Sequence, residues 1–403
     1  MTADPTERAG RYEHQPGGYR AFIPKRLPPD PPLDVDADMW RLLSQADRAL
    51  GRLDGWTEIL ANPDLFVSMY IRKEAVLSSQ IEGTQASMMD VVEFEAGALR
   101  PGRPEDVVEV VNYVAAMKHG LERLGQIPLC LRLIREMHEK LLTGVRGNKR
   151  SPGEFRKVQN RVGPPGTPLR EASYVPPPVP QMHRALSDLE KFLYNPAPMP
   201  VLLQVGLVHA QFEMIHPFVD GNGRIGRLLT TFLLSEKGVL KRPLLYLSYY
   251  LNRNRTEYYE RLQGVSGHGD WEGWLKFFLR GVGQVAEEAT ATARRVVTMR
   301  EAHRELIAKK TRRSSAKALE LLDQLYLRPV ASVNAIGQMT GLSFVSANDL
   351  ARRLCDSGLL REITGRSRNR RFSYAPYLAL FADTEGGVSP PRQFDRETKK
   401  QLR

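Results

Sequence analysis

A short segment in the middle of the chain combines side chains that can bind an anion, ligate a cation and accept a proton. It runs from His216 to Arg227 and reads His-Pro-Phe-Val-Asp-Gly-Asn-Gly-Arg-Ile-Gly-Arg. The imidazole of His216 titrates near neutrality and can take a proton from a hydroxyl group. The carboxylate of Asp220 can ligate a divalent cation that bridges phosphate oxygens. Together these residue types predict a site for polyphosphate chemistry.

The remaining residues of the segment suit a phosphate group. Gly221 and Gly223 let the backbone curl without a side chain in the way, so that its N–H groups can surround an anion. Arg224 and Arg227 are three residues apart and can reach the same anion with forked donors. A helix that is expected to start near Arg224 adds the positive end of its dipole. A histidine or a glycine before a helix is usually structural when it stands alone, but that reading does not account for the whole set.

The surrounding sequence predicts the elements that position this segment. Helical periodicity covers most of the chain as far as residue 313, so the fold class is expected to be mainly α. Two of the predicted helices, 199–215 and 224–237, flank the segment. Residues 147–180 change character, because glycines and prolines interrupt the apolar pattern there. We interpret them as a β-hairpin, or flap, between helices.

The last part of the chain has a different rhythm. It predicts helices over 316–326, 333–339 and 344–357, followed by strands over 358–363 and 370–374. This order is that of a winged helix-turn-helix. The predicted division of the whole chain is as follows: an extended N-terminal arm (1–35), an N-terminal helical region (36–125), a catalytic core (126–285), a linking helix (286–313), the winged helix-turn-helix (314–382) and a flexible tail (383–403).

Composition is that of an ordinary globular protein, with 42% hydrophobic and 26% charged residues. The chain has no uninterrupted apolar run long enough for a membrane span and no apolar signal-peptide core near its start, so no membrane partner is expected. Two widely separated cysteines, Cys130 and Cys355, favour free thiols and a cytoplasmic location. The net charge of +12 is concentrated at one end, because residues 294–403 contain 22 Lys and Arg against 11 Asp and Glu.

The segment resembles the signature of the Fic family of protein adenylyltransferases, His-Pro-Phe-x-Asp-Gly-Asn-Gly-Arg-x-x-Arg, at every defined position. The resemblance extends to the preceding helix (His209-Ala-Gln-Phe-Glu), to the flap and to Tyr246-Leu-Ser248, and it covers residues from about 20 to 285. Members of this family transfer AMP from ATP to a hydroxyl side chain of a target protein. The resemblance therefore implies a Fic-type helical core with a β-hairpin flap, with ATP as substrate and Mg²⁺ as cofactor.

The resemblance also implies roles for individual residues. His216 would be the general base and Asp220 the Mg²⁺ ligand, and the flap at 154–176 would clamp the target protein as an added strand. The residues that would bind the nucleotide are Glu82, Gly221, Asn222, Gly223, Arg224, Gly226 and Arg227. The kinase-like Doc branch of the superfamily has Lys where this chain has Gly223, so the glycine favours AMP transfer over phosphate transfer. The segment 252–259 is expected to contribute to the adenine pocket, and a homodimer is consistent with the resemblance.

A second motif, Ser78-Ser-Gln-Ile-Glu82-Gly83, resembles the inhibitory motif of Fic enzymes. In the subgroup that carries it on the same chain, its Glu pairs with the last arginine of the signature. Here Glu82 would pair with Arg227 and deny it to the γ-phosphate of ATP. Without the signature, Glu82 would be taken for a surface residue at a helix end. In some relatives the same Glu assists the reverse reaction, and the sequence leaves that alternative open.

The winged helix has two readings. Arg352 and Arg353 on its third helix suit contacts to DNA, as do the arginines that cluster at its wing, Arg366, Arg368, Arg370 and Arg371. Winged helices also serve as platforms for proteins, so the partner stays open at this stage. The alternatives to an adenylyltransferase are an AMP-removing or phosphotransferase enzyme of the Fic type, and a DNA-binding regulator whose Fic-like domain senses a nucleotide. The complete signature favours catalysis, because a sensor has no need of His216.

Overall fold

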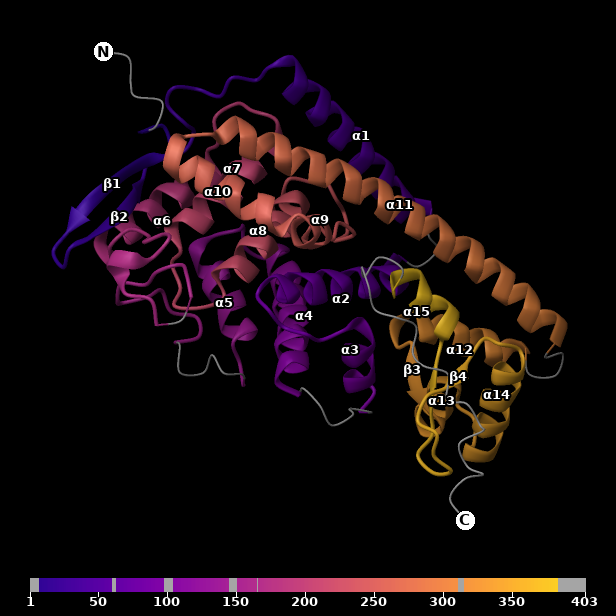
Figure 1. Ribbon diagram of the computed structural model, residues 1–403. Helices are drawn as coiled ribbons and strands as arrows, with labels where there is room; N and C mark the ends of the chain where they lie inside the picture. Colours follow the sequence, from indigo (N-terminus) through magenta and orange to yellow (C-terminus); the bar gives the residue numbers. More distant parts are fainter. Residues whose placement is uncertain are drawn as a thin grey trace, which may run out of the picture.

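The computed structural model describes residues 7–59, 63–97, 104–144, 151–164, 166–310 and 315–382, and it is mainly α-helical over these ranges, as expected (Figure 1). The helices that precede the C-terminal unit are α1 (Ala37–Ile59), α2 (Pro63–Ile81), α3 (Met88–Glu95), α4 (Pro104–Leu124), α5 (Leu131–Leu141), α6 (Val179–Tyr194), α7 (Val201–Ile215), α8 (Asn222–Glu236), α9 (Ser248–Arg253), α10 (Arg255–His268) and α11 (Trp271–Lys310). None of the helices in these ranges combines the length and the apolar character needed to cross a membrane.

Helices α7 and α8 form the centre of the core, and almost every residue of each is buried. A helix that is apolar on all sides is stable only when other elements surround it. Here α6, α10 and α11 pack around α7, while α2, α4 and α5 pack around α8. The loop that joins α7 to α8 is therefore fixed at both ends. The buried charged residues within α8 are Arg224 and Arg227, which therefore require partners.

Helix α11 connects the core to the C-terminal unit. Its 40 residues correspond to about 60 Å of helix at 1.5 Å per residue. It packs along α1 and then continues to the C-terminal unit (Figure 1). Residues 286–310 of the predicted linking helix are thus the later part of a helix that already begins at Trp271, and residues 311–313 lie outside the described residues.

The N-terminal region corrects one expectation, since residues 10–24 are not an extended arm. They form an antiparallel hairpin of β1 (Gly10–Gln15) and β2 (Tyr19–Pro24), in which Gly10 lies opposite Pro24. Two adjacent glycines, Gly17 and Gly18, supply the turn with positive φ angles of 117° and 75°. The first six residues of the predicted arm lie outside the described residues.

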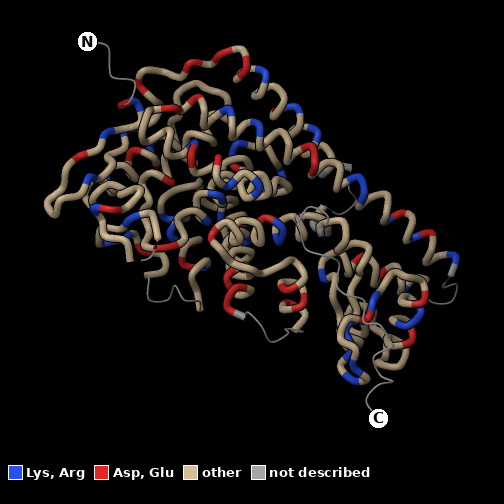
Figure 2. Tube along the Cα trace, in the orientation of Figure 1, with Lys and Arg blue, Asp and Glu red and all other residues tan. Residues whose placement is uncertain are grey.

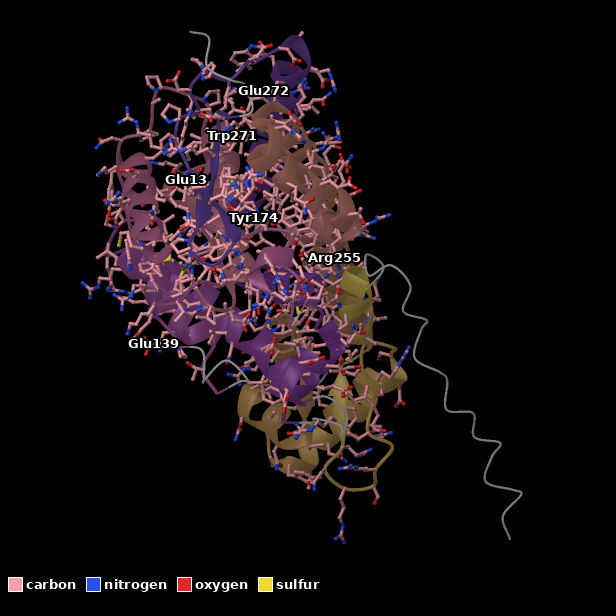
Figure 3. The ribbon with its side chains drawn as sticks, turned by 60° about the vertical axis from the view of Figure 1, so that its left-hand side comes forward. Glu13, Glu139, Tyr174, Arg255, Trp271 and Glu272 are labelled. Atoms are coloured by element: carbon pink, nitrogen blue, oxygen red, sulfur yellow. The ribbon has the colours of Figure 1, made fainter. Side chains whose placement is uncertain are left out.

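This hairpin packs on the segment that was predicted to be the flap (Figure 3). The backbone N–H of Phe22 donates to the carbonyl of Val175 over 2.9 Å. The buried ring of Phe22 lies 6.0 Å from the ring of Tyr174, measured between centroids. The hairpin therefore holds one end of the flap segment against the core.

The flap segment itself is not the predicted β-hairpin. Among its described residues, 151–164 and 166–180, the strand pairing is one isolated bridge between Val162 and Tyr174, and a short 3-10 helix, η3 (Leu169–Glu171), lies between them. Prolines in and around the segment, including Pro164 and Pro168, lack the N–H donor that a ladder needs. The chain therefore forms a loop with one strand-like contact.

The C-terminal unit contains the three predicted helices and the two predicted strands in the predicted order, and also a strand and a helix that were not predicted. The predicted elements are α12 (Ser315–Leu327), α13 (Val333–Thr340), α14 (Phe344–Asp356), β4 (Arg361–Glu362) and β5 (Arg371–Ser373), and the additional ones are β3 (Val330–Ser332) and α15 (Ala375–Ala382). The three strands form one antiparallel sheet in the order β3-β5-β4. Gly341, at φ 69°, makes the turn between α13 and α14. The predicted tail after residue 382 lies outside the described residues.

The C-terminal unit packs directly on α2. The ring of Tyr326 on α12 lies 5.5 Å from that of Phe66, and the ring of Phe381 on α15 lies 5.5 Å from that of Tyr70. Phe66 and Tyr70 are both on α2, whose other end carries Ser78. The same helix therefore contacts both the C-terminal unit and the candidate site.

Candidate active site

The loop between α7 and α8 presents His216 in an unusual backbone conformation. His216 ends α7 with φ 48° and ψ 61°, in the left-handed region that residues other than glycine seldom adopt. Its side chain is half-buried, and burial lowers the pKa of the imidazole to about 4. Its Nδ1 lies 3.4 Å from the carbonyl oxygen of Glu213. A neutral ring that carries its proton on Nδ1 leaves Nε2 able to accept another proton.

A buried arginine in the flap segment holds this loop. The Nε–H of Arg156 donates to the carbonyl of His216 over 3.1 Å, and its Nη1 donates to the carbonyl of Val158 over 3.2 Å. Its Nη2 donates to the carbonyl of Pro177. Burial lowers the pKa of Arg156 to about 10, so the group is still charged at neutral pH. Three carbonyl acceptors thus satisfy the guanidinium and fix the residue that bears the imidazole.

The start of α8 is shaped by a glycine and an asparagine. Gly221 precedes the helix at φ 79°, and a Cβ there would lie 3.3 Å from the Leu141 side chain. The Oδ1 of Asn222 accepts from the backbone N–H of Phe218, and its Nδ2 donates to the carbonyl of the same residue, both over 2.8 Å. The Asn222 amide therefore closes the loop. A phosphate would meet the backbone N–H groups at this helix start rather than that side chain.

His138, on α5, supports the loop from the other side. Its Nδ1 accepts from the backbone N–H of Gly153 over 2.9 Å, so the proton of a neutral ring is on Nε2, which donates to the carbonyl of Asp220 over 3.0 Å. Its ring stacks on Phe218 with centroids 3.7 Å apart. Burial lowers the pKa of His138 to about 4. The ring is thus a neutral connector between the flap segment and the loop.

Asp220 lies at the mouth of the loop with its side chain partly exposed. Its Oδ1 accepts from the backbone N–H of Gly221 over 2.7 Å and lies 3.8 Å from Nη2 of Arg224. Within the described ranges, no three His, Cys, Asp or Glu side chains come together in a group that could hold a metal ion. Mg²⁺ at nucleotide sites commonly uses one or two protein carboxylates together with substrate phosphates. Asp220 is compatible with that arrangement.

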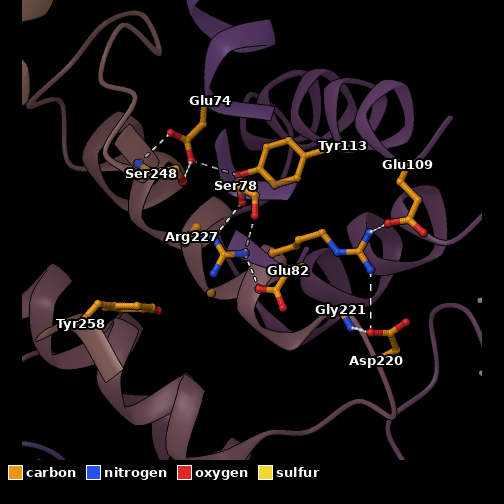
Figure 4. Close-up of polar contacts among 12 residues, drawn as sticks. Glu74, Ser78, Glu82, Glu109, Tyr113, Asp220, Gly221, Arg227, Ser248 and Tyr258 are labelled. Atoms are coloured by element: carbon orange, nitrogen blue, oxygen red, sulfur yellow. Dashed lines mark hydrogen bonds and ion pairs between the residues drawn. The ribbon is translucent and has the colours of Figure 1, made fainter. Parts of the chain in front are cut away.

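The two buried arginines of α8 each pair with a glutamate from the N-terminal helical region. Nη2 of Arg227 lies 2.6 Å from Oε1 of Glu82, which follows the end of α2 (Figure 4). Nη1 of Arg224 lies 3.2 Å from Oε2 of Glu109 on α4. The structure thus brings Glu82 and Arg227 together, as the inhibitory motif predicts. Glu109 was missed by sequence reasoning, because nothing in the local pattern of α4 distinguishes it.

Ser78 adds two further contacts to Arg227. Its Oγ accepts from Nε of Arg227 over 2.7 Å, and its carbonyl accepts from Nη2 over 3.0 Å. Burial alone would lower the pKa of Arg227, but the charge of Glu82 outweighs it and the pKa is raised. Burial likewise opposes ionisation of Glu82, yet the charge and hydrogen bond of Arg227 hold the pKa of Glu82 below its ordinary value. Both partners of the pair are therefore charged.

The two inner glycines of the segment are needed for close packing of carboxylates. A Cβ on Gly223 would lie 2.4 Å from Oε1 of Glu82, and one on Gly226 would lie 2.3 Å from Oε1 of Glu213. The Glu82 carboxylate thus lies beside Gly223 in the first turn of α8. An anion bound by the backbone N–H groups at the start of this helix would lie close to that carboxylate.

A buried acid on α2 lies behind the Glu82–Arg227 pair. Oε1 of Glu74 accepts from the hydroxyl of Ser248 over 2.5 Å and from that of Tyr113 over 3.3 Å, and Oε2 accepts from the backbone N–H of Ser248 over 3.1 Å (Figure 4). Burial raises the pKa of Glu74 to about 7. This network fixes α2 to the start of α9 and so positions Ser78.

The segment expected near the adenine pocket is divided between core and surface. The hydroxyl of Tyr258 lies 2.9 Å from Nε2 of His209, and both residues are buried. Tyr259 is partly exposed, and Nδ2 of Asn252 lies 3.4 Å from Oε1 of Gln80 on α2. Tyr258 is therefore a core residue. Tyr259 is accessible to solvent, and Asn252 lies beside the end of α2, close to the turn that carries Glu82.

Comparisons with known proteins agree with this arrangement. Residues 40–122 match the model of the Fic/DOC family N-terminal region, and residues 128–234 match the model of the Fic/DOC family. The first match contains Glu82 and Glu109, and the second contains the whole signature from His216 to Arg227. Residues 40–122 and 128–234 of the chain therefore correspond to the two regions that these Fic/DOC family models describe.

Individual relatives are similar over part of their length. A probable protein adenylyltransferase of Aquifex aeolicus is 34% identical over 92 residues, which are 23% of this chain and 26% of the relative. The protein adenylyltransferase Fic of Aedes aegypti is 32% identical over 174 residues, 42% of this chain and 31% of the relative. The matched regions thus span about a quarter to a third of these curated relatives.

A solved structure supports the fold. The crystal structure of a Fic family protein from Desulfovibrio desulfuricans G20 superposes with a TM-score of 0.57 at 20% identity. The superposition covers 85% of this chain and 97% of that chain. This similarity concerns the arrangement of the helices.

Proposed function

We propose that this protein is an adenylyltransferase that transfers AMP from ATP to a hydroxyl side chain of a target protein, and that Glu82 inhibits it. The observation that carries the proposal is the contact of Glu82 with Arg227 beside the first turn of α8. A carboxylate held there mimics the anion that the helix start and the arginine would otherwise bind. The names of the relatives, which include protein adenylyltransferases, support AMP transfer as the reaction.

The phosphates of ATP would lie against the start of α8. The backbone N–H groups of residues 222–224 and the guanidinium of Arg224 would bind the α- and β-phosphates, and Arg227 would bind the γ-phosphate. Asp220 would hold Mg²⁺, which when bound neutralises charge on the phosphate oxygens. This placement leaves His216 on the side of the α-phosphate, at the other end of the loop.

His216 would act as the general base. Its Nε2 would take the proton of the target hydroxyl as that oxygen attacks the α-phosphorus of ATP. The bond from the α-phosphorus to the bridging oxygen would break, and pyrophosphate would leave with the electron pair. Burial lowers the pKa of His216 to about 4, so the ring is neutral at pH 7 and can accept a proton.

The target protein would dock at the flap segment. Val158 is exposed there, and Val162 makes the one strand-like contact of the segment with Tyr174. An extended peptide added beside residues 154–176 would bring its hydroxyl toward the loop that carries His216. The carbonyl of His216 is already tied to the flap through Arg156, which supports that proximity.

Inhibition would arise from competition for Arg227. While Glu82 pairs with Arg227, Nη2 of the guanidinium is engaged by Glu82 and by the carbonyl of Ser78, and the carboxylate repels the approaching anion. Glu82 lies in a turn after α2, where the N–H of Gly83 donates to Gln80 and Gly83 has φ 101°. A turn can move with less disruption than the body of a helix, so the pair can open.

The test is transfer of labelled AMP from ATP onto protein by purified full-length variants. Glu82→Gly should label itself or proteins of a lysate more strongly than the wild type, and adding His216→Ala to Glu82→Gly should abolish the labelling. Glu122→Gln, which changes an exposed carboxylate on α4, serves as the control and should match the wild type. Equal labelling by the wild type and Glu82→Gly would remove the inhibitory role. Absence of labelling by every variant would contradict AMP transfer.

A further inference from the structure

The C-terminal unit is basic and presents its positive charge away from the catalytic core. Residues 315–382, which form the unit, contain nine Lys and Arg against five Asp and Glu, a net charge of +4. Lys and Arg gather at the tip of the loop between β4 and β5, at the end of the unit that stands clear of the core (Figure 2). We call this loop, residues 363–370, the wing. A positive surface of this kind attracts polyanions.

Hydrogen bonds hold the backbone of the wing, and arginine side chains in and beside it are exposed to solvent. Both carboxylate oxygens of Glu362 accept from the backbone N–H of Gly365, and Oε1 also accepts from that of Thr364. The wing's acidic neighbour is thus engaged by the loop backbone. Within the described part of the chain, Arg361, Arg366 and Arg368 have no ion-pair partner, and all three are exposed.

Helix α14 lies beside the wing and offers an accessible first turn. Phe344 and Val345, at its start, are 61% and 76% exposed. Ser343 caps the helix by accepting from the N–H of Ser346. The guanidinium of Arg370 in the wing donates to Oδ1 of Asn348, which joins the wing to α14. Helix and wing therefore form one continuous surface.

The acidic groups on this surface are neutralised locally. Asp349 pairs with Arg352 over 2.7 Å and also with Arg353, so α14 itself is close to neutral. The excess positive charge comes from the wing. Arg352 remains 66% exposed despite its pairing, and it can exchange Asp349 for a phosphate.

We propose that α14 and the wing form a docking surface for duplex DNA. A helix of this size fits the major groove, where the exposed Phe344 and Val345 can contact thymine methyl groups and Asn348 can reach a base edge. The positive end of the α14 dipole and the arginines of the wing contact phosphates. The charge and its location favour DNA over a protein partner, because a protein platform built on the two apolar residues has no use for an arginine-rich wing.

The test is fluorescence anisotropy of a labelled mixed-sequence duplex of about 24 base pairs, titrated with the full-length protein at several salt concentrations. With three to four phosphate contacts, the logarithm of the binding constant should fall with the logarithm of salt with a slope of about −3 to −4. The double variant Arg366→Glu with Arg368→Glu should weaken binding at least tenfold at about 50 mM salt and reduce the slope by about two.

The matched control reverses two exposed arginines on α1, Arg48→Glu with Arg52→Glu, and so makes the same change in net charge at a distant surface. It should bind like the wild type, and both variants should unfold at the wild-type temperature. Three results would overturn the proposal. The first two are absence of duplex binding by the wild type at about 50 mM salt and an equal loss of duplex affinity in the two double variants. The third is a dimer in sedimentation that Phe344→Ser with Val345→Ser dissociates while the duplex stays unbound. The last result would assign the surface to a second copy of the chain.

Discussion

The two arginines of helix α8 are held in different ways, although each pairs with a glutamate. Glu82, the partner of Arg227, lies in a turn, and its side chain is 36% exposed. Glu109, the partner of Arg224, lies within the body of α4, and its side chain is 20% exposed. Oε1 of Glu82 also lies 2.4 Å from the position of a Cβ on Gly223, in the first turn of α8, and the atoms nearest to that position belong to Glu82 and Arg227 rather than to Glu109.

This difference indicates that Glu82 competes with an anionic ligand for Arg227, whereas Glu109 holds Arg224 in position. A carboxylate beside the helix start excludes an anionic ligand, and one in a turn can be displaced. A carboxylate fixed within a helix holds its arginine in one orientation, which is useful if that arginine must meet a phosphate. We therefore expect that removal of Glu82 activates the enzyme and that removal of Glu109 does not. The following predictions, ordered from the largest expected effect to the smallest, test this contrast.

The largest effect is expected for Arg227 itself. In the activated Glu82→Gly background, Arg227→Ala should lower kcat/KM for ATP by about 10²–10³-fold. The substitution removes a buried, preorganised positive charge that would bind the γ-phosphate. Initial rates of labelled AMP transfer over a range of ATP concentrations measure this. A loss of less than threefold would show that Arg227 does not contact the nucleotide, and the Glu82–Arg227 pair would then be only structural.

A third buried arginine, Arg156, contacts the loop at His216, the proposed general base, rather than the phosphate site. Arg156→Met should lower kcat roughly tenfold in the Glu82→Gly background while leaving the affinity for ATP unchanged, because Arg156 contacts the carbonyl of His216 rather than the phosphate site. Arg156→Lys, which keeps a donor, should recover part of the rate. Single-turnover rates and ATP binding, measured on the same folded preparations, separate the two quantities. A change confined to ATP affinity would refute the assignment.

Glu109 gives the direct contrast with Glu82. Glu109→Gln should not activate the wild-type enzyme, and in the Glu82→Gly background it should reduce kcat/KM by only a few-fold, because Arg224 keeps its charge and its neighbour Asp220. Activation by Glu109→Gln to the level reached by Glu82→Gly would mean that the two glutamates play the same part.

The smallest effect concerns stability and Glu74. Its folded pKa of about 7 lies above the ordinary value of 4.5, so the folded protein holds this proton more tightly than the unfolded chain. The stabilisation is complete below about pH 4.5 and is lost as the pH rises through about 7, and its size is at most about 3 kcal/mol.

Glu74→Gln removes this titration while keeping a hydrogen-bonding side chain of the same size. The free energy of unfolding from urea titrations at pH 5 and pH 8 should therefore fall less between the two pH values in the variant than in the wild type. Glu213, whose pKa burial also raises to about 7, remains in both proteins and cancels in the comparison. Identical pH dependence in the two proteins would contradict the raised pKa of Glu74.

Some features of the site could be predicted from the sequence because they are local. The segment from His216 to Arg227 places a base, a carboxylate, glycines and arginines on one loop and one helix start, and the structure keeps them together. The Glu82–Arg227 contact joins residues 145 positions apart, and it was predicted only because the motif around Glu82 resembles a known one. Charge alone would not have selected Glu82 from the other glutamates.

Other features depend on tertiary packing that no local pattern reports. Arg224 meets Glu109 across 115 residues, Arg156 meets His216 across 60, and His138 meets Asp220 across 82. In each case the packing of distant helices and loops buries a polar side chain. That side chain then bonds to an acceptor on the segment packed against it. The flap was predicted as a hairpin from its glycines, but its prolines prevent a ladder. The N-terminal hairpin was missed, although Gly17 and Gly18 between two alternating runs were an available signal.

The central claim is that ATP binds against the start of α8 and that Glu82 opposes it. Titration calorimetry of ATP with Mg²⁺ into wild-type and Glu82→Gly protein tests this most directly. The account predicts that Glu82→Gly binds ATP at least about tenfold more tightly than the wild type, and that Arg227→Ala removes this gain. Equal affinities in the wild type and Glu82→Gly, or no binding to either, would contradict it.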